Sequence, residues 1–397
     1  MTDNLATSAG GTEEMELSVV IPCLNEEDTL AACIRKAQQA LLESAVIGEV
    51  IVADNGSTDR SRAIALELHA VLVPVEQRGY GSALMAGIAA ARGRYIVMAD
   101  GDDSYDFRQI PRFLQKLREG AELVQGCRLP SGGGRIERGA MPLLHRWVGN
   151  PVLSRLAQAW FGSPVHDVYC GMRGFSRDLY RRLDLRCTGM EFATEMIIKA
   201  SLQGSAIAEV PITLHPDGRK SHAPHLRTFR DGWRTLRLFL LYSPRWLFVL
   251  PGAALVLIGA VGYALAMPGT LLLGVVLDAH TLLVSSLAIL CGYQAILFAI
   301  FTKTFAIGEG LLPMDSTMKR FFALFDLEKA LLAGLGTLIL GLLLIFQAFN
   351  EWRLMHFGPL DYARTMRWVI PGVLLAALAF QTILSSFFVS LLGMRRK

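Results

Sequence analysis

The segment R-Y-I-V-M-A-D-G-D-D, residues 94–103, is the clearest indication of how this chain folds. The mostly apolar run Arg94–Ala99 stops at Asp100, and Asp102 and Asp103 follow after one glycine. A short apolar run bounded by turn-forming residues is typical of a buried strand. In sheets of parallel strands, ligands bind beyond the carboxyl ends of the strands. We therefore predict a buried strand over residues 94–99 with a ligand site at its end.

Strand-like and helix-like segments alternate through the rest of the first 245 residues. Predicted strands cover Leu17–Cys23, Val50–Ala53, Val71–Val75 and Glu122–Gly126. Predicted helices run near residues 26–43, from Gly79 to Ala91 and over Gln109–Glu119. Strands that alternate with helices of about 10 to 15 residues predict a mostly parallel sheet with helices on both faces. The expected fold class is a Rossmann-like α/β domain.

The second part of the chain is apolar enough to cross a membrane. Over all 397 residues the mean hydropathy is +0.38, and the apolar excess begins at Trp246. Four almost uncharged stretches reach the roughly 20 residues that a spanning helix needs; they cover residues 246–267, 281–303, 330–350 and 368–394. The short apolar piece 267–277 contains a Pro-Gly break and indicates a turn or a re-entrant segment. A helical transmembrane domain is favoured over buried core helices.

Lysines and arginines in the loops predict how these helices are oriented. The loop at 268–280 contains none, the loop at 303–329 contains four, and the chain ends Arg395-Arg396-Lys397. Three arginines in the loop at 351–367 weaken the contrast. Because positively charged loops favour the cytoplasmic side, we predict a multi-pass protein of the cytoplasmic (inner) membrane with a cytoplasmic N-terminal domain.

Residue pattern divides the N-terminal part further. Residues 1–15 are polar and lack the apolar core of a signal peptide, so we expect a disordered leader. Residues 16–222 form the α/β domain. Residues 223–245 are expected to be an amphipathic helix at the membrane interface, with a helix packed on the α/β domain as the alternative. Its two stripes are Arg227, Arg230, Arg234 and Arg237, and Phe229, Trp233, Leu236 and Leu240.

Charge and cysteine content argue against two classes of protein. Residues 1–245 contain 29 of the 39 Lys and Arg and 28 of the 35 Asp and Glu, so this part is nearly neutral. A nucleic-acid-binding domain concentrates basic charge, so nucleic acid is not an expected partner. The six cysteines lack metal-ligand or redox spacing, which indicates reduced thiols in a cytosolic compartment.

The acidic residues after the strand at 94–99 have the chemistry of a metal site. Asp100 and Asp102 are separated by one glycine, so their carboxylates can converge on a hard cation such as Mg²⁺ or Mn²⁺. Asp54 ends another predicted strand and suits a hydrogen bond to a nucleobase or ribose. We expect these three carboxylates to meet around a cation and a nucleotide. The segment Arg78-Gly79-Tyr80-Gly81 opens a predicted helix and is a weak signal for a phosphate-binding loop.

Several segments together resemble glycosyltransferase family 2 and, within it, the dolichyl- and polyprenyl-phosphate sugar synthases. The likeness covers residues 16–245 and implies a GT-A catalytic domain, a nucleotide-sugar donor and Mg²⁺ or Mn²⁺ as cofactor. The family segments are Val20-Ile21-Pro22-x-x-Asn25-Glu26, Asp54-Asn55-Gly56-Ser57-Thr58-Asp59, Arg78-Gly79-x-Gly81 and Asp100-Gly101-Asp102-Asp103. The segments similar to the subgroup are Gly126-x-Arg128, Asp167-x-x-Cys170-Gly171-Met172-Arg173 and Gly189-Met190-Glu191-Phe192-x-x-Glu195.

The resemblance also implies roles for single residues. Asp54 would contact the base, and Asp100 and Asp102 the ribose, the diphosphate and the metal, with Asp103 as a further catalytic candidate. Residues implied in nucleotide-sugar binding are Pro22, Asn25, Glu26, Asp54, Gly79, Gly81, Asp100 and Arg219. Those implied in binding the acceptor phosphate, which arginine grips through two hydrogen bonds, are Arg128, Arg146 and Lys220; for Arg146 a solvated surface position is the alternative. Glu191 and Glu195 are candidates for positioning roles.

The expected reaction transfers a hexose with inversion from a nucleotide sugar to a polyprenyl or dolichyl phosphate. A phosphate monoester is largely dianionic at neutral pH, so no strong catalytic base is needed, and alignment and charge stabilisation supply the catalysis. UDP-glucose and GDP-mannose are favoured as donors, and UDP-N-acetylglucosamine stays open. The expected partners are the nucleotide sugar, the lipid phosphate and the membrane, and a homo-oligomer is compatible with them.

Two alternatives remain. One is another membrane enzyme of the family, either a polysaccharide synthase or a protein-directed glycosyltransferase. Polymer synthases carry Gln-x-x-Arg-Trp, whereas Arg146-Trp147 and Arg245-Trp246 here lack the glutamine. The other is a flippase or scaffold that uses a nucleotide-binding domain for regulation, which the absence of charge pairs and inverted repeats in the predicted spans disfavours.

Overall fold

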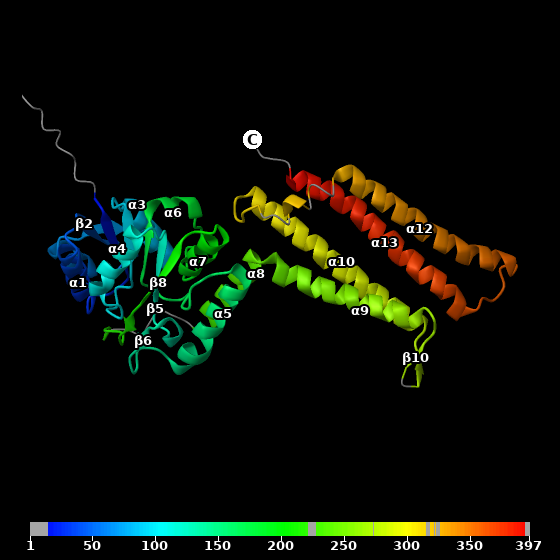
Figure 1. Ribbon diagram of the computed structural model, residues 1–397, viewed down its shortest axis with the longest axis horizontal. Helices are drawn as coiled ribbons and strands as arrows, with labels where there is room; N and C mark the ends of the chain where they lie inside the picture. The colour runs from blue at the N-terminus through cyan, green and yellow to red at the C-terminus, as the bar shows by residue number, and fades with distance from the viewer. Residues whose placement is uncertain are drawn as a thin grey trace, which may run out of the picture. The chain divides into compact units, whose positions relative to one another are not determined.

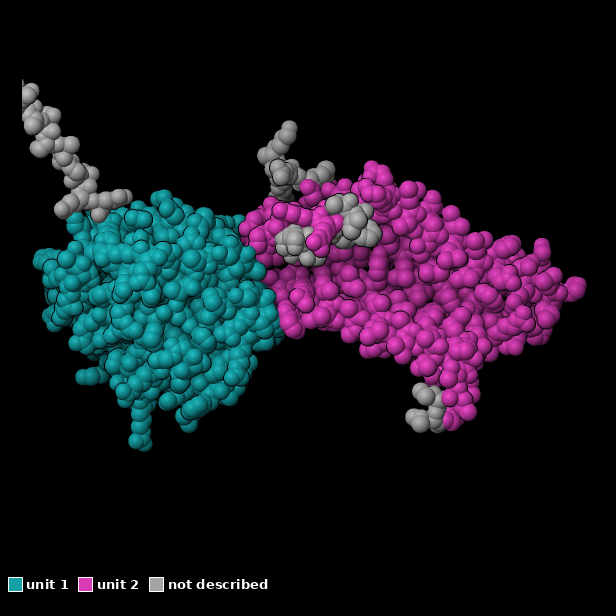
Figure 2. Space-filling model, in the orientation of Figure 1, with its two compact units in different colours: residues 1–239 teal, residues 240–397 magenta. Residues whose placement is uncertain are grey.

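The computed structural model describes residues 15–220, 228–272, 274–314, 318–320, 322 and 326–393. The chain divides into two compact units, residues 1–239 and 240–397, which Figure 2 colours separately. Except for Met15, the leader predicted at residues 1–15 lies outside the described residues, as does the start of the helix predicted at 223–245.

The first unit is built on a seven-stranded sheet with strand order β3-β2-β1-β4-β7-β5-β8. Its strands are β1 Leu17–Cys23, β2 Gly48–Asp54, β3 Val71–Pro74, β4 Tyr95–Met98, β5 Leu123–Cys127, β7 Arg173–Ser176 and β8 Ile207–Pro211. Only β7 is antiparallel to its neighbours, β4 and β5, which confirms the mostly parallel sheet. The strand β7 was not predicted because its sequence R-G-F-S is short and contains a charge.

Helices cover both faces of this sheet (Figure 1). They are α1 Leu30–Glu43, α2 Ser61–Glu67, α3 Tyr80–Ala90, α4 Ile110–Arg118, α5 Asn150–Phe161, α6 Arg177–Leu183 and α7 Phe192–Leu202. Alternate side chains of a strand point to opposite faces: Val19 of β1 lies in the core with α1 and α4, whereas Val20 lies beside Gly87 of α3. Each fully buried Leu or Phe side chain contributes about 1.5–3 kcal/mol.

The helix predicted over residues 26–43 begins only at Leu30. Residues 25–27 are not helical because their backbone amides donate to side chains that follow β2: Asn25 N donates to Ser57 Oγ in the loop, and Glu26 N to Ser61 Oγ at the start of α2. In return, Thr58 N donates to Asn25 Oδ1.

Within its described residues, the second unit contains four helices long and apolar enough to cross a membrane, in agreement with the four predicted spans. They cover Arg245–Ala266, which includes α9 Leu250–Ala266, then α10 Ala279–Gly308, α12 Leu327–Leu354 and α13 Tyr362–Gly393. Glycines let neighbouring helices approach closely: a Cβ on Gly252 would lie 2.7 Å from the carbonyl oxygen of Gly292. In place of a re-entrant piece, β10 Leu271–Leu272 and β11 Val275–Val276 pair as an antiparallel hairpin.

The helix α8 Thr228–Tyr242 follows the α/β sheet and has two different faces. One face packs on α5, where the Phe239 ring meets the Phe161 ring edge to face at 5.4 Å between centroids. On another face Phe229 and Trp233 are 84% and 60% exposed. Packing on the α/β domain, the alternative in the sequence analysis, therefore accounts for one side of this helix, and its exposed aromatic side chains remain available to an interface.

Candidate active site

Asp54 ends β2 and is buried among its own partners. Its Oδ1 accepts from Ser57 N at 3.1 Å, and its Oδ2 forms an ion pair with Arg62 Nε at 2.6 Å. Burial raises the pKa of Asp54, but the hydrogen bonds from Ser57 and Arg62 outweigh this and hold the pKa below its ordinary value. Asp54 is therefore a carboxylate at neutral pH, as a hydrogen-bond acceptor for a base or ribose must be.

Asp54 and Asp100 lie on strands that are separated by β1. With strands spaced about 4.8 Å apart, the two strand ends are separated by roughly 10 Å, and Asp54 pairs with Arg62 rather than facing Asp100. Asp54 is therefore not placed to share a cation with Asp100 and Asp102, and its expected contact with the base or ribose stays a prediction. The three residues do share the carboxyl edge of the sheet, so an elongated ligand is needed to reach both ends.

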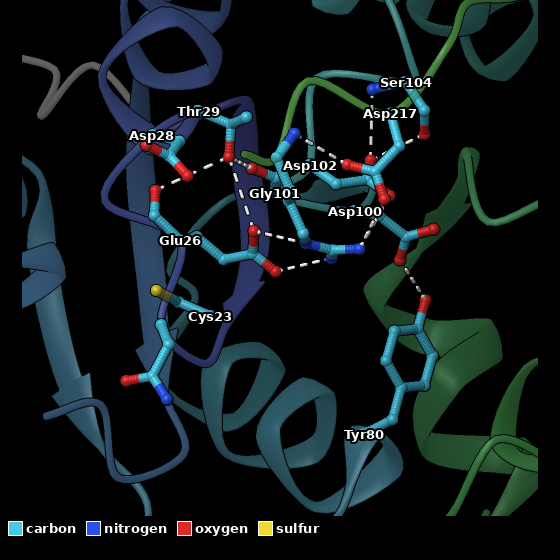
Figure 3. A network of polar contacts seen from close by, with 12 residues as sticks. Cys23, Glu26, Asp28, Thr29, Tyr80, Asp100, Gly101, Asp102, Ser104 and Asp217 are labelled. Carbon is cyan, nitrogen blue, oxygen red and sulfur yellow. Dashed lines mark hydrogen bonds and ion pairs between the residues drawn. The ribbon is translucent and has the colours of Figure 1, made fainter. Parts of the chain in front are cut away.

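Asp100 follows β4 and is closely surrounded. Its Oδ1 accepts a hydrogen bond from the Tyr80 hydroxyl at 2.8 Å (Figure 3). The other oxygen, Oδ2, lies next to Gly171: a Cβ added to Gly171 would be only 2.5 Å from this oxygen. Burial, followed by repulsion from Asp102, raises the pKa of the Asp100 carboxyl to about 6. A positive charge brought next to this carboxyl lowers that pKa again.

The neighbouring acidic residues point in different directions. Asp102 Oδ1 accepts from the Ser104 hydroxyl at 2.6 Å, and Asp102 Oδ2 lies 3.5 Å from Arg219 Nη1. Asp103 has φ +60° and forms an ion pair with Lys36 of α1 at 2.7 Å. Its side chain is thus directed to the α1 helix, and the structure gives no support to Asp103 as a third catalytic carboxylate.

Arg219 bridges the acidic groups of this site. Its Nε donates to Glu26 Oε2 at 2.8 Å, and its Nη1 donates to Asp217 Oδ2 at 2.8 Å. Glu26 also lies beside Thr29, whose hydroxyl donates to the carbonyl oxygen of Gly101 at 2.7 Å (Figure 3). The expected grouping of Glu26 and Arg219 with Asp102 is therefore present.

The glycine loop before α3 has the close packing that makes its glycines necessary. Gly79 has φ +142°, its N–H donates to Asn55 Oδ1 at 2.7 Å, and an added Cβ would lie 2.3 Å from the Thr188 carbonyl oxygen. At Gly81 an added Cβ would lie 2.4 Å from the Cys187 carbonyl oxygen. This packing fixes the start of α3, and phosphate binding there stays a prediction.

The remaining predicted residues have different surroundings. Arg128 is buried, with Nε and Nη2 on Asp167 at 2.7 and 2.9 Å and Nη1 on the Tyr105 hydroxyl at 3.2 Å. Three of its five N–H groups are used in this way, so Arg128 forms a buried structural ion pair, and its role in binding the acceptor phosphate stays a prediction. Arg146 is half-buried, and its Nε has no partner among the described residues. Lys220 is exposed and donates its backbone N–H to Asp28, while Pro22 is buried in β1.

The two positioning candidates lie on or near α7. Glu195 accepts the backbone N–H groups of Arg186 and Cys187 and forms a buried ion pair with Lys199 at 3.0 Å. It therefore shapes the loop that packs on Gly79 and Gly81. Glu191 lies 3.7 Å from Arg234 of α8.

The carboxylates fit a divalent cation only together with further ligands. Within the described parts of the chain, no three His, Cys, Asp or Glu side chains converge to hold a metal by themselves. Mg²⁺ in such sites is typically bound by one or two carboxylates together with substrate phosphates. Asp100 and Asp102, both hard oxygen donors, fit that pattern when a diphosphate supplies further oxygens.

Tyr80, Ser104 and Asp217 belong to this site although the sequence analysis did not single them out. Tyr80 lies inside the glycine motif, and Ser104 directly follows the acidic motif, so their proximity in sequence was an available signal. Asp217 lies two residues before Arg219, so the same signal was available for it; the fold of the chain after β9 Thr213–Leu214 brings Arg219 to Glu26 and Asp102.

A mostly parallel α/β sheet with carboxylates beyond β4, joined to membrane-length helices, defines a membrane-bound glycosyltransferase of the GT-A fold. Residues 18–184 match the family model "Glycosyl transferase family 2", and residues 300–393 match its "Glycosyltransferase family 2 C-terminal transmembrane region". The low-salt glycan biosynthesis hexosyltransferase Agl6 of Haloferax volcanii is 42% identical over 301 residues, which are 76% of this chain and 71% of that protein. The chain therefore belongs to glycosyltransferase family 2, and it is a multi-pass membrane enzyme that transfers a hexose.

Two further proteins are similar to this chain. The dolichyl-phosphate hexose transferase of Haloferax volcanii is 33% identical over 198 residues, which are 50% of this chain and 82% of that protein. A solved structure of glucosyl-3-phosphoglycerate synthase from Mycobacterium tuberculosis with Mn²⁺ and uridine diphosphate is 24% identical and covers 58% of this chain and 80% of that one, with a TM-score of 0.46.

Proposed function

We propose that this enzyme transfers a hexose, with inversion, from UDP-glucose or GDP-mannose to the phosphate of a polyprenyl or dolichyl lipid at the cytoplasmic face of the membrane. The similarity to a dolichyl-phosphate hexose transferase supports a lipid-phosphate acceptor. The membrane-length helices of the second unit support an acceptor that resides in the bilayer.

The observation that carries this proposal is an apolar surface on the catalytic unit beside an arginine. Leu143 and Trp147 are 73% and 67% exposed, and Leu144, Val148 and Val152 are also exposed on the same helical stretch. Arg146 lies among them: its guanidinium carbon is 5.4 Å from the centroid of the Trp147 ring, and its buried Nε has no hydrogen-bond partner in the described part of the chain. Large apolar side chains gathered on a surface mark a binding site. An isoprenoid chain with a phosphate at its end matches an apolar surface beside an arginine.

The acidic edge of the sheet supplies the donor side of the reaction. Asp54 would hold the base or ribose, and Asp100 and Asp102 would hold Mg²⁺ or Mn²⁺ on the diphosphate. The bound cation would neutralise the charge that develops on the leaving diphosphate. Arg219 lies beside the same carboxylates and would neutralise that charge further. The acceptor phosphate, already an anion, attacks the anomeric carbon from the opposite side, so alignment rather than a base controls the rate.

The test uses membranes that contain the full chain, labelled UDP-glucose, GDP-mannose or UDP-N-acetylglucosamine, and added polyprenyl phosphate. We expect one sugar per lipid, in a product that mild acid cleaves. Labelled polymer or glycoprotein as the main product would overturn the proposal.

A pair of variants tests the acceptor side. Arg146→Ala is expected to raise the KM for polyprenyl phosphate about tenfold or more, since a charge-assisted hydrogen bond contributes about 1.5–3 kcal/mol. Its KM for the donor should stay unchanged. Arg155→Ala, which removes an exposed arginine from α5, is the matched control.

A further inference from the structure

The carboxylates of Asp100 and Asp102 are held in the same manner. Tyr80 donates its hydroxyl to Oδ1 of Asp100 at 2.8 Å, and Ser104 donates its hydroxyl to Oδ1 of Asp102 at 2.6 Å (Figure 3). Among the residues that the structure describes, no donor contacts Oδ2 of Asp100, and Oδ2 of Asp102 lies 3.5 Å from Arg219 Nη1. Each carboxylate thus has one oxygen committed to a protein hydroxyl and a second oxygen free of such a bond.

Tyr80 is itself fixed from two sides. It is the first residue of α3, between Gly79 and Gly81, whose α-carbons pack on the backbone of residues 187–188. Ser82 N donates to the Thr188 carbonyl oxygen at 3.1 Å, which anchors the next residue of the turn. The Tyr80 hydroxyl therefore has a fixed position, and through it the Asp100 carboxylate is tied to the start of α3.

Ser104 is held equally well. Its side chain is buried, and its backbone N–H donates to the same Asp102 oxygen at 3.1 Å. Its carbonyl oxygen accepts from His215 N at 3.0 Å, which fixes the loop against the segment that leads to Arg219. Asp102 Oδ1 therefore has two donors from one residue.

We propose that Tyr80 and Ser104 are positioning residues of the cation site, each orienting one carboxylate so that its Oδ2 is presented to the divalent cation. The inference rests on the proposed function in that it assumes a cation carried with a nucleotide diphosphate. Mg²⁺ requires near-octahedral geometry, so a carboxylate that can rotate or chelate through both oxygens binds it less well. Hydrogen-bonded partners of metal ligands typically change metal affinity about 10–100-fold when they are removed.

Because Tyr80 lies in the glycine loop, it is expected to couple cation binding to nucleotide binding. A diphosphate at the start of α3 and a cation at Asp100 would be linked through this one hydroxyl. Tyr80 should therefore matter more for binding of the cation with nucleotide than for binding of the nucleotide alone.

The test measures Mn²⁺ binding directly, by the loss of the free Mn²⁺ electron paramagnetic resonance signal, with the full chain in detergent and UDP or GDP present. Tyr80→Phe keeps the ring and is expected to weaken Mn²⁺ binding about tenfold or more. Ser104→Ala should weaken it less, because the backbone N–H of residue 104 remains. Tyr180→Phe, which removes a hydroxyl from a ring that stacks on Phe175, is the matched control and should bind as the wild type does.

Enzyme kinetics give a second readout. At saturating Mn²⁺ the kcat of Tyr80→Phe should return to within about twofold of the wild type, whereas the Mn²⁺ concentration for half-maximal rate stays raised. Equal Mn²⁺ affinity in wild type and Tyr80→Phe, or a kcat that excess Mn²⁺ does not restore, would overturn the inference. Because Mn²⁺ binding is measured without acceptor, a failure to glycosylate polyprenyl phosphate would count against the proposed function alone.

Discussion

Arg219 and Glu26 are 193 positions apart in the chain and form a buried ion pair, with Nε donating to Oε2 at 2.8 Å. The pair joins the loop that follows β9 to the turn that follows β1. It also places a guanidinium 3.5 Å from Asp102, beside the proposed cation site. The loop carrying Arg219 is therefore tied to the proposed donor side of the site by contacts within the protein.

Replacing Glu26 with glutamine tests this pair. Glu26→Gln keeps the shape but removes the charge, so Arg219 loses one of the ion pairs that hold it beside Asp102 and keeps the one with Asp217. We expect kcat/KM for the donor to fall about 10–100-fold, in line with the loss of a charge-assisted bond of about 1.5–3 kcal/mol. Glu27→Gln, at an exposed neighbour, is the control, and an unchanged donor KM in Glu26→Gln would contradict the assignment.

Substitution of Asp102 should abolish activity, whereas substitution of Asp103 should leave it nearly unchanged. Asp102→Ala removes a proposed cation ligand and is expected to abolish transfer in membranes with labelled donor and polyprenyl phosphate. Asp103→Asn loses only the ion pair with Lys36, and kcat/KM should change by no more than about twofold, as for surface substitutions worth about 0.5 kcal/mol. Activity of Asp102→Ala above a tenth of the wild-type value would remove it from the cation site.

Substitution of Arg128 should lower the stability of the fold more than it changes the KM for the acceptor phosphate. Asp167 is fully buried, so Arg128→Ala leaves an uncompensated carboxylate, at a cost of about 3–5 kcal/mol. We expect a clearly lower thermal unfolding midpoint of the full chain in detergent. A variant with unchanged stability and a raised KM for polyprenyl phosphate would instead restore the acceptor role that the family resemblance implied.

The buried pair of Glu195 and Lys199 predicts a pH dependence of stability. Burial raises the pKa of Glu195, but the N–H of Cys187 and the Lys199 ammonium outweigh it, so its pKa lies below the ordinary 4.5. A lowered carboxyl pKa stabilises the fold above the unfolded value, and that contribution disappears as the pH falls through the folded value.

The comparison of wild type with Glu195→Gln isolates this contribution. The difference in thermal unfolding midpoint should be constant near neutral pH and shrink as the pH is lowered below about 4.5. Glu122→Gln, which loses a more exposed pair with Arg182, should show a smaller difference. A gap that grows at acidic pH has the wrong sign and would contradict the assignment.

Local sequence patterns were enough to predict the order of the strands, the functional groups and the membrane-length helices. Apolar runs that end at Cys23, Asp54 and Asp100 are local patterns, and because parallel strands share an edge, they place functional groups at one edge of the sheet. Four apolar stretches near 20 residues long similarly predicted the four membrane-length helices, since bilayer thickness sets helix length.

The packed chain, in contrast, establishes which of these groups meet. The interposed strand β1 separates Asp54 from Asp100, and Asp103, whose φ is positive, pairs with Lys36. The hydroxyl of Tyr80 on Asp100 and the contact of Arg219 with Glu26 depend on how distant segments pack. Hydrogen bonds and ion pairs act over about 3–4 Å, a scale that local pattern does not specify and that the packed chain alone sets.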